Sequence, residues 1–264
     1  MEREAAELAE HIKASSKYAH ISDETVQRIL LAYLPRYKNQ KEVLKAVKKQ
    51  LHIIHGAFFP DRCHERALEL IGDTRLADRE LSLKLMELHP STRERLPSLQ
   101  AFYDLLSPHM RDAKTVLDIG CGFHPCAFPF MGLSGGVRYR AGDIDHGTVQ
   151  VVQAFFQRLH MACDARILDA ASEMPHDDAD VAFLFKLVPV LEQQRKGLAY
   201  RLIQSLRAKT VIATFPIRSL SGREKDMEQF YSSQFEKNLP AGCSILQKEA
   251  VGTELVYIVS QNRQ

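Results

Sequence analysis

The sequence lacks any run of apolar residues that approaches the roughly 20 needed to span a bilayer, so we expect no membrane segment. Residues 1–10 are acidic and favour a helix, which is unlike a signal peptide. The five cysteines are an odd number and form no Cys-x-x-Cys pair, which predicts reduced thiols and argues against a zinc site. These absences together favour a cytoplasmic protein without a metal.

An excess of charge of one sign is also absent, because 35 basic residues are nearly balanced by 33 acidic ones. The protein is therefore no polycation, and any affinity for an anionic partner must come from a local cluster. Such a cluster lies between Arg36 and Lys49, where six lysines or arginines accompany a single acid, Glu42.

Residues 1–110 are expected to be helical throughout. A capping signal at Ser22 predicts a helix near 22–34, which Pro35 would end. A second helix near 40–54 has apolar residues on one face and lysines on the other. The lysine face favours docking onto an anionic surface, although a merely solvated face is an equally simple interpretation. Further helices are expected near 61–71 and 76–88.

The most informative segment is a buried strand that breaks into a glycine turn. It runs from Thr115 to Gly122 and has the form Asp-x-Gly-x-Gly, in which Asp118 precedes the glycines. Glycine allows a turn with positive φ and a close approach of backbone to a ligand. At the carboxyl edge of a parallel sheet, such a turn forms a crevice of nucleotide size. An acid before the glycines is typical of S-adenosylmethionine-dependent methyltransferases, and a purely structural turn is the alternative.

From Thr115 onward, apolar strands alternate with helices, which predicts a doubly wound parallel sheet. A short turn at Gly252 would join the last two strands as an antiparallel hairpin. This pattern favours an α/β, class I (Rossmann-like) methyltransferase domain over 111–264, preceded by a helical domain over 1–110. Strands are expected at 115–120, 137–142, 164–168, 179–185, 210–215, 244–250 and 254–260, helices near 146–160 and 190–206, and an irregular stretch over 216–243.

An acidic side chain also follows each of the next two strands. Asp143 lies where a carboxylate can accept hydrogen bonds from ribose hydroxyls, and Asp145 is the alternative. Asp169 lies where an acid can receive an adenine amino group. Each acid could instead cap a helix, but three acids at successive strand ends favour a cofactor site. The methionine carboxylate of such a cofactor needs a cation, and the spacing does not separate Arg95 from Arg93.

Five segments carry a family resemblance when taken in order: 89–96 (His-x-Ser-Thr-x-Glu-Arg-Leu), 118–125, 185–192, 215–223 and 252–255. Together they are similar to the Arm/Rmt family of aminoglycoside-resistance methyltransferases. Members of that family methylate N7 of guanine 1405 in the decoding site of 16S ribosomal RNA. The resemblance therefore implies this reaction, with S-adenosyl-L-methionine as cofactor and the 30S ribosomal subunit as partner. It also implies a monomer that binds no DNA.

The resemblance also implies roles for individual residues. Contact with the target nucleotide is implied for Lys186, which would position it, and for Arg223 and Met227. RNA docking is implied for Lys17, Lys48 and Lys49, and Arg218 offers a further cation near the target. Cofactor binding is implied for Phe58, His89, Pro90, Ser91, Arg95, Gly120, Asp143, Asp169, Ala170, Phe185 and Gln194.

The chemistry of guanine N7 agrees with the residues present. N7 carries an in-plane lone pair, so catalysis can consist of positioning and needs no general base. The sequence contains no Asn-Pro-Pro-Tyr or Asp-Pro-Pro-Tyr motif, which makes an exocyclic amino group a poor target. Because the N7 edge lies in the deep groove of A-form RNA, the nucleotide should be flipped out. Phe230 and Tyr231 could provide a stacking surface but are expected to be core residues of a helix.

Two alternative functions remain open at this point. One is a methyltransferase of similar build that modifies N1 of a nearby adenine in 16S rRNA. The other is a non-catalytic protein that binds the cofactor and RNA without turnover.

Overall fold

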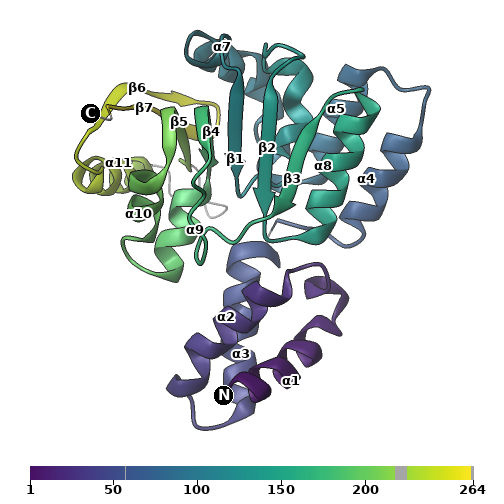
Figure 1. The fold of residues 1–264 in the computed structure, drawn as a ribbon, viewed down its shortest axis with the longest axis vertical. Helices are drawn as coiled ribbons and strands as arrows, with labels where there is room; N and C mark the ends of the chain where they lie inside the picture. The colour runs from purple at the N-terminus through teal and green to yellow at the C-terminus, as the bar shows by residue number, and fades with distance from the viewer. Residues whose placement is uncertain (57, 218–224, 263–264) are drawn as a thin grey trace.

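The computed structural model describes residues 1–56, 58–217 and 225–262, which form two parts with separate hydrophobic cores. Figure 1 shows a three-helix unit projecting from a larger domain built around a β-sheet. No helix in the described ranges is both long and apolar enough to cross a membrane. The three-helix unit (residues 1–56) contains α1 (Glu2–Lys13), η1 (Ser16–Tyr18), α2 (Asp23–Tyr33), η2 (Leu34–Arg36), α3 (Gln40–Leu51) and the π-helical turn η3 (His52–Gly56).

Side-chain caps set the starts of α2 and α3. Ser22 Oγ accepts a hydrogen bond from the Thr25 N–H at 3.2 Å, and Asn39 Oδ1 accepts one from the Glu42 N–H at 3.0 Å. Each cap satisfies a backbone donor that the first helical turn would otherwise leave unpaired. Both helices predicted for this region are confirmed.

Seven strands in the described part of the chain form one sheet of order β3-β2-β1-β4-β5-β7-β6. β7 is antiparallel to both of its neighbours, and all other pairs are parallel. The β6–β7 turn contains Gly252 with φ +59°, as the predicted hairpin requires. The fold is therefore of the class I, Rossmann-like type. The strands are β1 (Thr115–Ile119), β2 (Arg138–Asp143), β3 (Cys163–Ile167), β4 (Asp178–Phe185), β5 (Arg207–Pro216), β6 (Cys243–Val251) and β7 (Glu254–Gln261).

Helices cover both faces of the sheet (Figure 1). On one face, α4, α5, α7 and α8 enclose a core that includes Phe102 and Phe155. On the other, α9, α10 and α11 pack Leu202 and Phe235 against the strands. Gly197, with φ +78°, separates α9 from α10, which the sequence predicts as one helix. These elements are α4 (Cys63–Gly72), α5 (Asp78–Leu88), α6 (Pro90–Arg93), η4 (Leu96–Ser98), α7 (Leu99–Met110), η5 (His124–Phe130), α8 (His146–Arg158), α9 (Leu187–Gln194), α10 (Leu198–Ser205) and α11 (Lys225–Asn238).

One segment differs clearly from the sequence prediction. The stretch 216–243, expected to be irregular, contains α11 over Lys225–Asn238. Tyr231 of this helix is half-buried, with its ring 5.4 Å from that of Phe215. Phe230 is 58% exposed, so the expectation of a core position is wrong for this residue.

The hydrophobic cores divide the chain earlier than residue 110. Buried residues up to Ile54 form the core of the three-helix unit, whereas Cys63 and the helices that follow it belong to the core of the sheet domain. Helices α4, α5 and α7 therefore support the sheet structurally. An RNA-docking role for the whole segment 1–110 remains a proposal.

Candidate active site

A cavity opens where the carboxyl ends of β1 to β4 face the three-helix unit. It encloses about 880 Å³ between protein atoms, including its open mouth. Both parts of the protein contribute to its walls, the three-helix unit through α2 and η3. The lining residues are Arg28, Ile54, His55, Phe58, Phe59, His89, Ser91, Thr92, Arg95, Gly120, Cys121, Gly122, His124, Asp143, Ile144, Leu168, Asp169, Ala170, Phe185, Lys186, Leu187, Val190, Leu191 and Gln194.

The glycine turn after β1 forms one wall of the cavity. Gly120 and Gly122 have φ values of +62° and +48°, which L side chains rarely adopt. A Cβ at Gly120 would lie 2.8 Å from Leu187, and one at Gly122 would lie 3.0 Å from the His89 ring. Side chains are thus excluded on steric as well as conformational grounds, and the backbone lies bare at the cavity.

Asp118, which precedes this turn, is buried and is absent from the cavity lining. Its Oδ2 accepts a hydrogen bond from the Tyr139 hydroxyl at 2.7 Å and pairs with His124 Nδ1 at 2.7 Å. His124 Nε2 lies 3.1 Å from the Tyr103 hydroxyl. In this structure the acid of the motif therefore binds side chains of the core next to the glycine turn.

Asp143 lies at the carboxyl end of β2 with its carboxylate fixed at the cavity. Oδ2 accepts from the Gly122 N–H at 2.9 Å, and Oδ1 accepts from the Asp145 N–H at 3.1 Å. Burial, followed by the nearby charge of Asp145, raises the pKa of Asp143 to about 6 against these hydrogen bonds. Each oxygen keeps a lone pair for a ligand donor.

Asp145, the alternative ribose ligand, is occupied elsewhere and is absent from the cavity lining. Its carboxylate pairs with His55 at 2.7 Å and His64 at 2.9 Å, and it caps α8 by accepting from the Thr148 N–H at 2.6 Å. Burial opposes ionisation, but the bonds to the two histidines lower the pKa of Asp145 well below its ordinary value. The geometry thus brings Asp143, and not Asp145, to the cavity.

Asp169 reaches the cavity after β3, but its carboxylate already has partners. Oδ1 accepts from the Ala171 N–H at 2.9 Å, and Oδ2 accepts from Thr25 Oγ1 at 2.9 Å and Arg28 Nε at 2.7 Å. Arg28 also donates to Gln194 Oε1 at 3.0 Å. No sequence signal points to Arg28, because its contact with Asp169 joins residues 141 positions apart.

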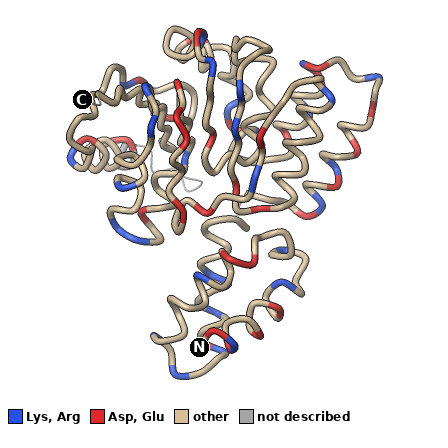
Figure 2. Tube along the Cα trace, viewed as in Figure 1, with Lys and Arg blue, Asp and Glu red and all other residues tan. Residues whose placement is uncertain are grey.

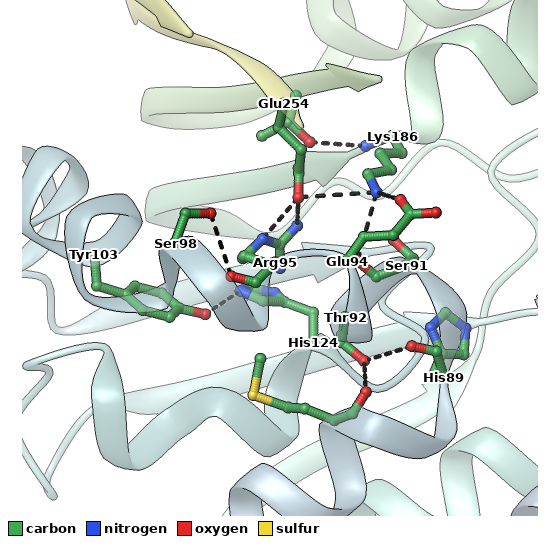
Figure 3. Close-up of polar contacts among 12 residues, drawn as sticks. His89, Ser91, Thr92, Glu94, Arg95, Ser98, Tyr103, His124, Lys186 and Glu254 are labelled. Atoms are coloured by element: carbon green, nitrogen blue, oxygen red, sulfur yellow. Dashed lines mark hydrogen bonds and ion pairs between the residues drawn. The ribbon is translucent and has the colours of Figure 1, made fainter. Parts of the chain in front are cut away.

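Arg95 is buried at the cavity wall and forms two hydrogen bonds with Glu254. Its Nε and Nη2 each lie 2.9 Å from a carboxylate oxygen of Glu254, as Figure 3 shows. Nη1 is buried without a hydrogen-bond partner among the described residues. Arg93, which the sequence could not distinguish from Arg95, is exposed and absent from the cavity lining. An unpaired guanidinium N–H at a cavity is a donor that suits a ligand carboxylate.

Lys186 follows β4 and adopts the left-handed conformation, with φ +56°. Its N–H lies 3.1 Å from Thr214 Oγ1 of the neighbouring strand. Its Nζ lies 2.6 Å from Glu94 and 3.9 Å from Glu254 (Figure 3). A non-glycine residue in this region stores about 1–3 kcal/mol of strain and is typical of functional sites.

His89 and Cys126 are poor candidates for a general base and for a nucleophile, respectively. Burial, helped by the charge of Lys186, lowers the pKa of His89 to about 3, so the ring is neutral. Pro125-Cys126 is a Pro-Cys pair, but Cys126 is fully buried in the core, and burial raises the pKa of its thiol far above the ordinary value. The expectation of positioning without a base stays a prediction.

The other predicted positions fall into three groups. Phe58, His89, Ser91, Ala170, Phe185 and Gln194 line the cavity, whereas Pro90 begins α6 and is absent from the lining. The RNA-docking candidates lie on the three-helix unit, with Lys17 and Lys49 exposed and Lys48 half-buried, and Met227 lies on α11. Arg218 and Arg223 lie outside the described residues.

These features fit a nucleoside that carries a carboxylate. Asp143 supplies acceptors for sugar hydroxyls, and Arg95 Nη1 supplies a free donor. His89 Nδ1 is a second buried atom without a hydrogen-bond partner in the described ranges. The bare turn at Gly120 leaves room between them.

A family model described as ribosomal RNA methyltransferase (FmrO) matches residues 14–258. The chain belongs to this family. The 16S rRNA (guanine(1405)-N(7))-methyltransferase of Serratia marcescens is 35% identical over 95% of this chain and 96% of its own length. The 16S rRNA (guanine(1405)-N(7))-methyltransferase of Micromonospora echinospora is 33% identical over 97% of this chain and 96% of its own length.

Solved structures also show that this member of the methyltransferase family is similar to 16S rRNA methyltransferases. The crystal structure of the 16S rRNA methyltransferase RmtF in complex with S-adenosyl-L-homocysteine has a TM-score of 0.89 and 36% identity, covering 98% of both chains. The structure of the 16S rRNA methylase RmtB has a TM-score of 0.83 and 31% identity, covering 96% of this chain and 97% of that one. The resemblance to the Arm/Rmt family is thereby confirmed.

The raised pKa of Asp143 predicts a pH-dependent stability. Its folded-state pKa of about 6 exceeds the ordinary value of 3.8, so its contribution to stability is fully present below about pH 4 and is lost as the pH rises through 6. Asp143→Asn keeps the group neutral, so its free energy of unfolding should not show this loss. Between pH 4 and 7 the stability of the variant relative to the wild type should therefore rise by up to about 3 kcal/mol. Urea unfolding across this range measures the difference. Asp112→Asn, at a side chain that is 96% exposed, is the control, and parallel curves for all three proteins would contradict the prediction.

Proposed function

We propose that this protein methylates N7 of guanine 1405 in 16S rRNA, using S-adenosyl-L-methionine, and thereby confers aminoglycoside resistance. The observation that carries the proposal is likeness over nearly the whole chain, at 36% identity and a TM-score of 0.89, to a 16S rRNA methyltransferase. The cavity supports it independently, because its donors and acceptors suit the cofactor. Neither alternative function has a comparable observation in its favour.

Different residues at the cavity would bind different parts of the cofactor. Asp143 would accept from the ribose hydroxyls, and Arg95 Nη1 would donate to the methionine carboxylate. Asp169, Ala170 and Gln194 would border the adenine. The rings of Phe58 and His89 would pack against the cofactor. When bound, the cofactor supplies an electrophilic methyl group on a sulfonium. The protein's part is to hold the acceptor nitrogen in line with that methyl group.

Guanine N7 needs no deprotonation, which agrees with the chemistry of the site. His89 is neutral and buried, and the His124 ring is held by Asp118 and Tyr103. Adenine N1 also carries a lone pair, so this argument alone does not separate the two acceptors. The near-full-length relatives named for guanine N7 favour that atom.

Access to N7 requires that the nucleotide leaves the helix, since the edge is buried in A-form RNA. Lys186, which lines the cavity, and Met227, on α11, would contact the extruded nucleotide, as would Arg218 and Arg223. The three-helix unit would dock on RNA through Lys17, Lys48 and Lys49. Figure 2 shows that its basic residues are interleaved with acidic ones, so docking relies on local contacts and not on a uniform positive surface.

We further propose that the substrate is the assembled 30S subunit, that the enzyme acts as a monomer, and that it works in the cytoplasm. The cavity is completed by two parts of one chain, so no second copy is needed to build it. Transfer of a tritiated methyl group from the cofactor tests the proposal. We expect labelling of 30S subunits at guanine 1405 and little labelling of naked 16S rRNA. Binding without transfer would indicate the non-catalytic alternative, and a modified adenine would indicate the other enzyme.

The cofactor site yields a prediction for Asp143. Asp143→Ala should weaken binding of S-adenosyl-L-homocysteine by about 2–3 kcal/mol, roughly 30- to 150-fold, because hydrogen bonds to a carboxylate are lost. Because the unliganded pKa is about 6, wild-type affinity should also fall as the pH drops below 6. Calorimetry at several pH values measures both effects. Unchanged affinity in the variant would remove Asp143 from the ribose site.

The lysine face yields a prediction for RNA docking. Lys48→Glu combined with Lys49→Glu should weaken 30S binding and make its salt dependence shallower, by about one unit of slope for each lost phosphate contact. Affinity for S-adenosyl-L-homocysteine should not change. Lys84→Glu with Lys114→Glu, both on the sheet domain, is the matched charge reversal. If the two double variants behaved alike, the lysine face would be only a solvated surface.

A further inference from the structure

Four charged side chains of alternating sign lie in a row, two of which, Arg95 and Lys186, line the cavity. Arg95 and Glu254 form the buried end of this row, with side chains about 1% exposed. Lys186 Nζ lies 3.9 Å from Glu254 and 2.6 Å from Glu94. Lys186 is 9% exposed, whereas the Glu94 side chain is 43% exposed. Figure 3 shows Lys186 between the two glutamates, with Glu94 at the outer end.

The inner part of this row is explained by packing. The guanidinium carbon of Arg95 lies 4.4 Å from the centre of the Phe102 ring and 4.8 Å from that of Phe185. Glu254 neutralises the charge of Arg95 and accepts two hydrogen bonds from it. Because Arg95 and Glu254 already satisfy each other, the buried pair does not require Glu94. Among the described residues, Glu94 therefore pairs with Lys186 alone, and its carboxylate is half-open to solvent.

Glu94 is held in place as firmly as a recognition group should be. Its N–H donates to the Pro90 carbonyl at 3.0 Å, which closes the last turn of α6. Oε2 pairs with Lys186, and Oε1 has no hydrogen-bond partner within the described part of the chain. The pair thus offers an acceptor and a donor side by side, next to the cavity that Lys186 lines with Gly120 and Asp143.

We propose that Glu94 and Lys186 together recognise the Watson–Crick edge of the extruded guanine. Glu94 would accept from N1–H and the N2 amino group, and Lys186 would donate to O6. A carboxylate can accept two parallel donors, and an ammonium can only donate, so the pair matches guanine in both positions. This inference rests on the proposed function and names the residues that select its base.

Adenine fits the same pair poorly. It presents an N1 lone pair where guanine has N1–H, and an amino group where guanine has O6. The Glu94 carboxylate would face the lone pair of N1, and Lys186 would face an amino group. A site built to hydrogen-bond a donor rejects analogues that lack it, because its own polar groups are left unpaired.

The experiment compares guanine with inosine at position 1405, in reconstituted 30S subunits. Inosine keeps N7, O6 and N1–H but lacks the N2 amino group. We expect the wild type to methylate guanine about tenfold faster than inosine, and Glu94→Ala and Glu94→Gln to lose most of this preference. Glu87→Gln, at an exposed residue of α5, is the control and should keep it.

The guanine-to-inosine ratio separates recognition from support. If Glu94 only neutralised Lys186, both variants would lose activity on the two bases equally, and the ratio would stay at the wild-type value. That result, or a wild type without preference, would overturn the inference. Affinity for S-adenosyl-L-homocysteine should be unchanged in Glu94→Gln, which shows that its cavity is intact. A wild type that fails to methylate guanine at all would instead refute the proposed function.

Discussion

Arg95 and Glu254 lie 159 positions apart in the sequence and meet as a buried ion pair with two 2.9 Å hydrogen bonds. Burial would raise the pKa of Glu254, but the charge of Arg95 outweighs it and holds the pKa below the ordinary value. Removing one partner of such a pair typically costs about 3–5 kcal/mol, because the other charge stays buried alone. The pair ties the segment before the sheet to the last strand. Glu254 also lies 3.9 Å from Lys186 Nζ, and Arg95 Nη1 is buried without a hydrogen-bond partner among the described residues.

A second set of contacts joins the three-helix unit to the cofactor cavity. Asp145 holds His55 and His64, and Arg28 reaches from α2 to Asp169 and Gln194. The proposed RNA-docking unit therefore supplies part of the cavity wall and is more than an appended module. A change in how this unit sits on RNA would act directly on Asp169 and Gln194, the side chains that Arg28 contacts.

Much of the fold could be predicted because its signals are local. The strands match within a few residues, since most are short apolar runs, and an acid or a glycine lies at or shortly after the ends of β1, β2 and β3. The hairpin followed from Gly252, and the cavity from Gly120, Asp143 and Asp169. In each case a single segment contains both the strand and the group at its end.

What the sequence could not predict depends on distant partners. The roles of Arg28 and Glu254 appear only when segments more than 140 positions apart meet. Asp143 and Asp145 are alike in sequence, and the histidines that occupy Asp145 decide between them. Helix α11 was missed because its residues carry little helical periodicity and Phe230 remains exposed. Tertiary packing, more than local propensity, forms that helix.

A reaction at guanine N7, as proposed, would need no general base, which would shift the burden of catalysis onto placement. His89 is neutral, and the thiols of Cys121 and Cys126 are buried with raised pKa values. A reaction that needs no proton transfer gains nothing from a titrating group, but it loses rate steeply when the acceptor is misaligned. The left-handed backbone of Lys186 is consistent with this demand, because its strain persists only where surrounding contacts enforce one position. Rigid charge pairs, and not acid–base groups, are what such a site needs.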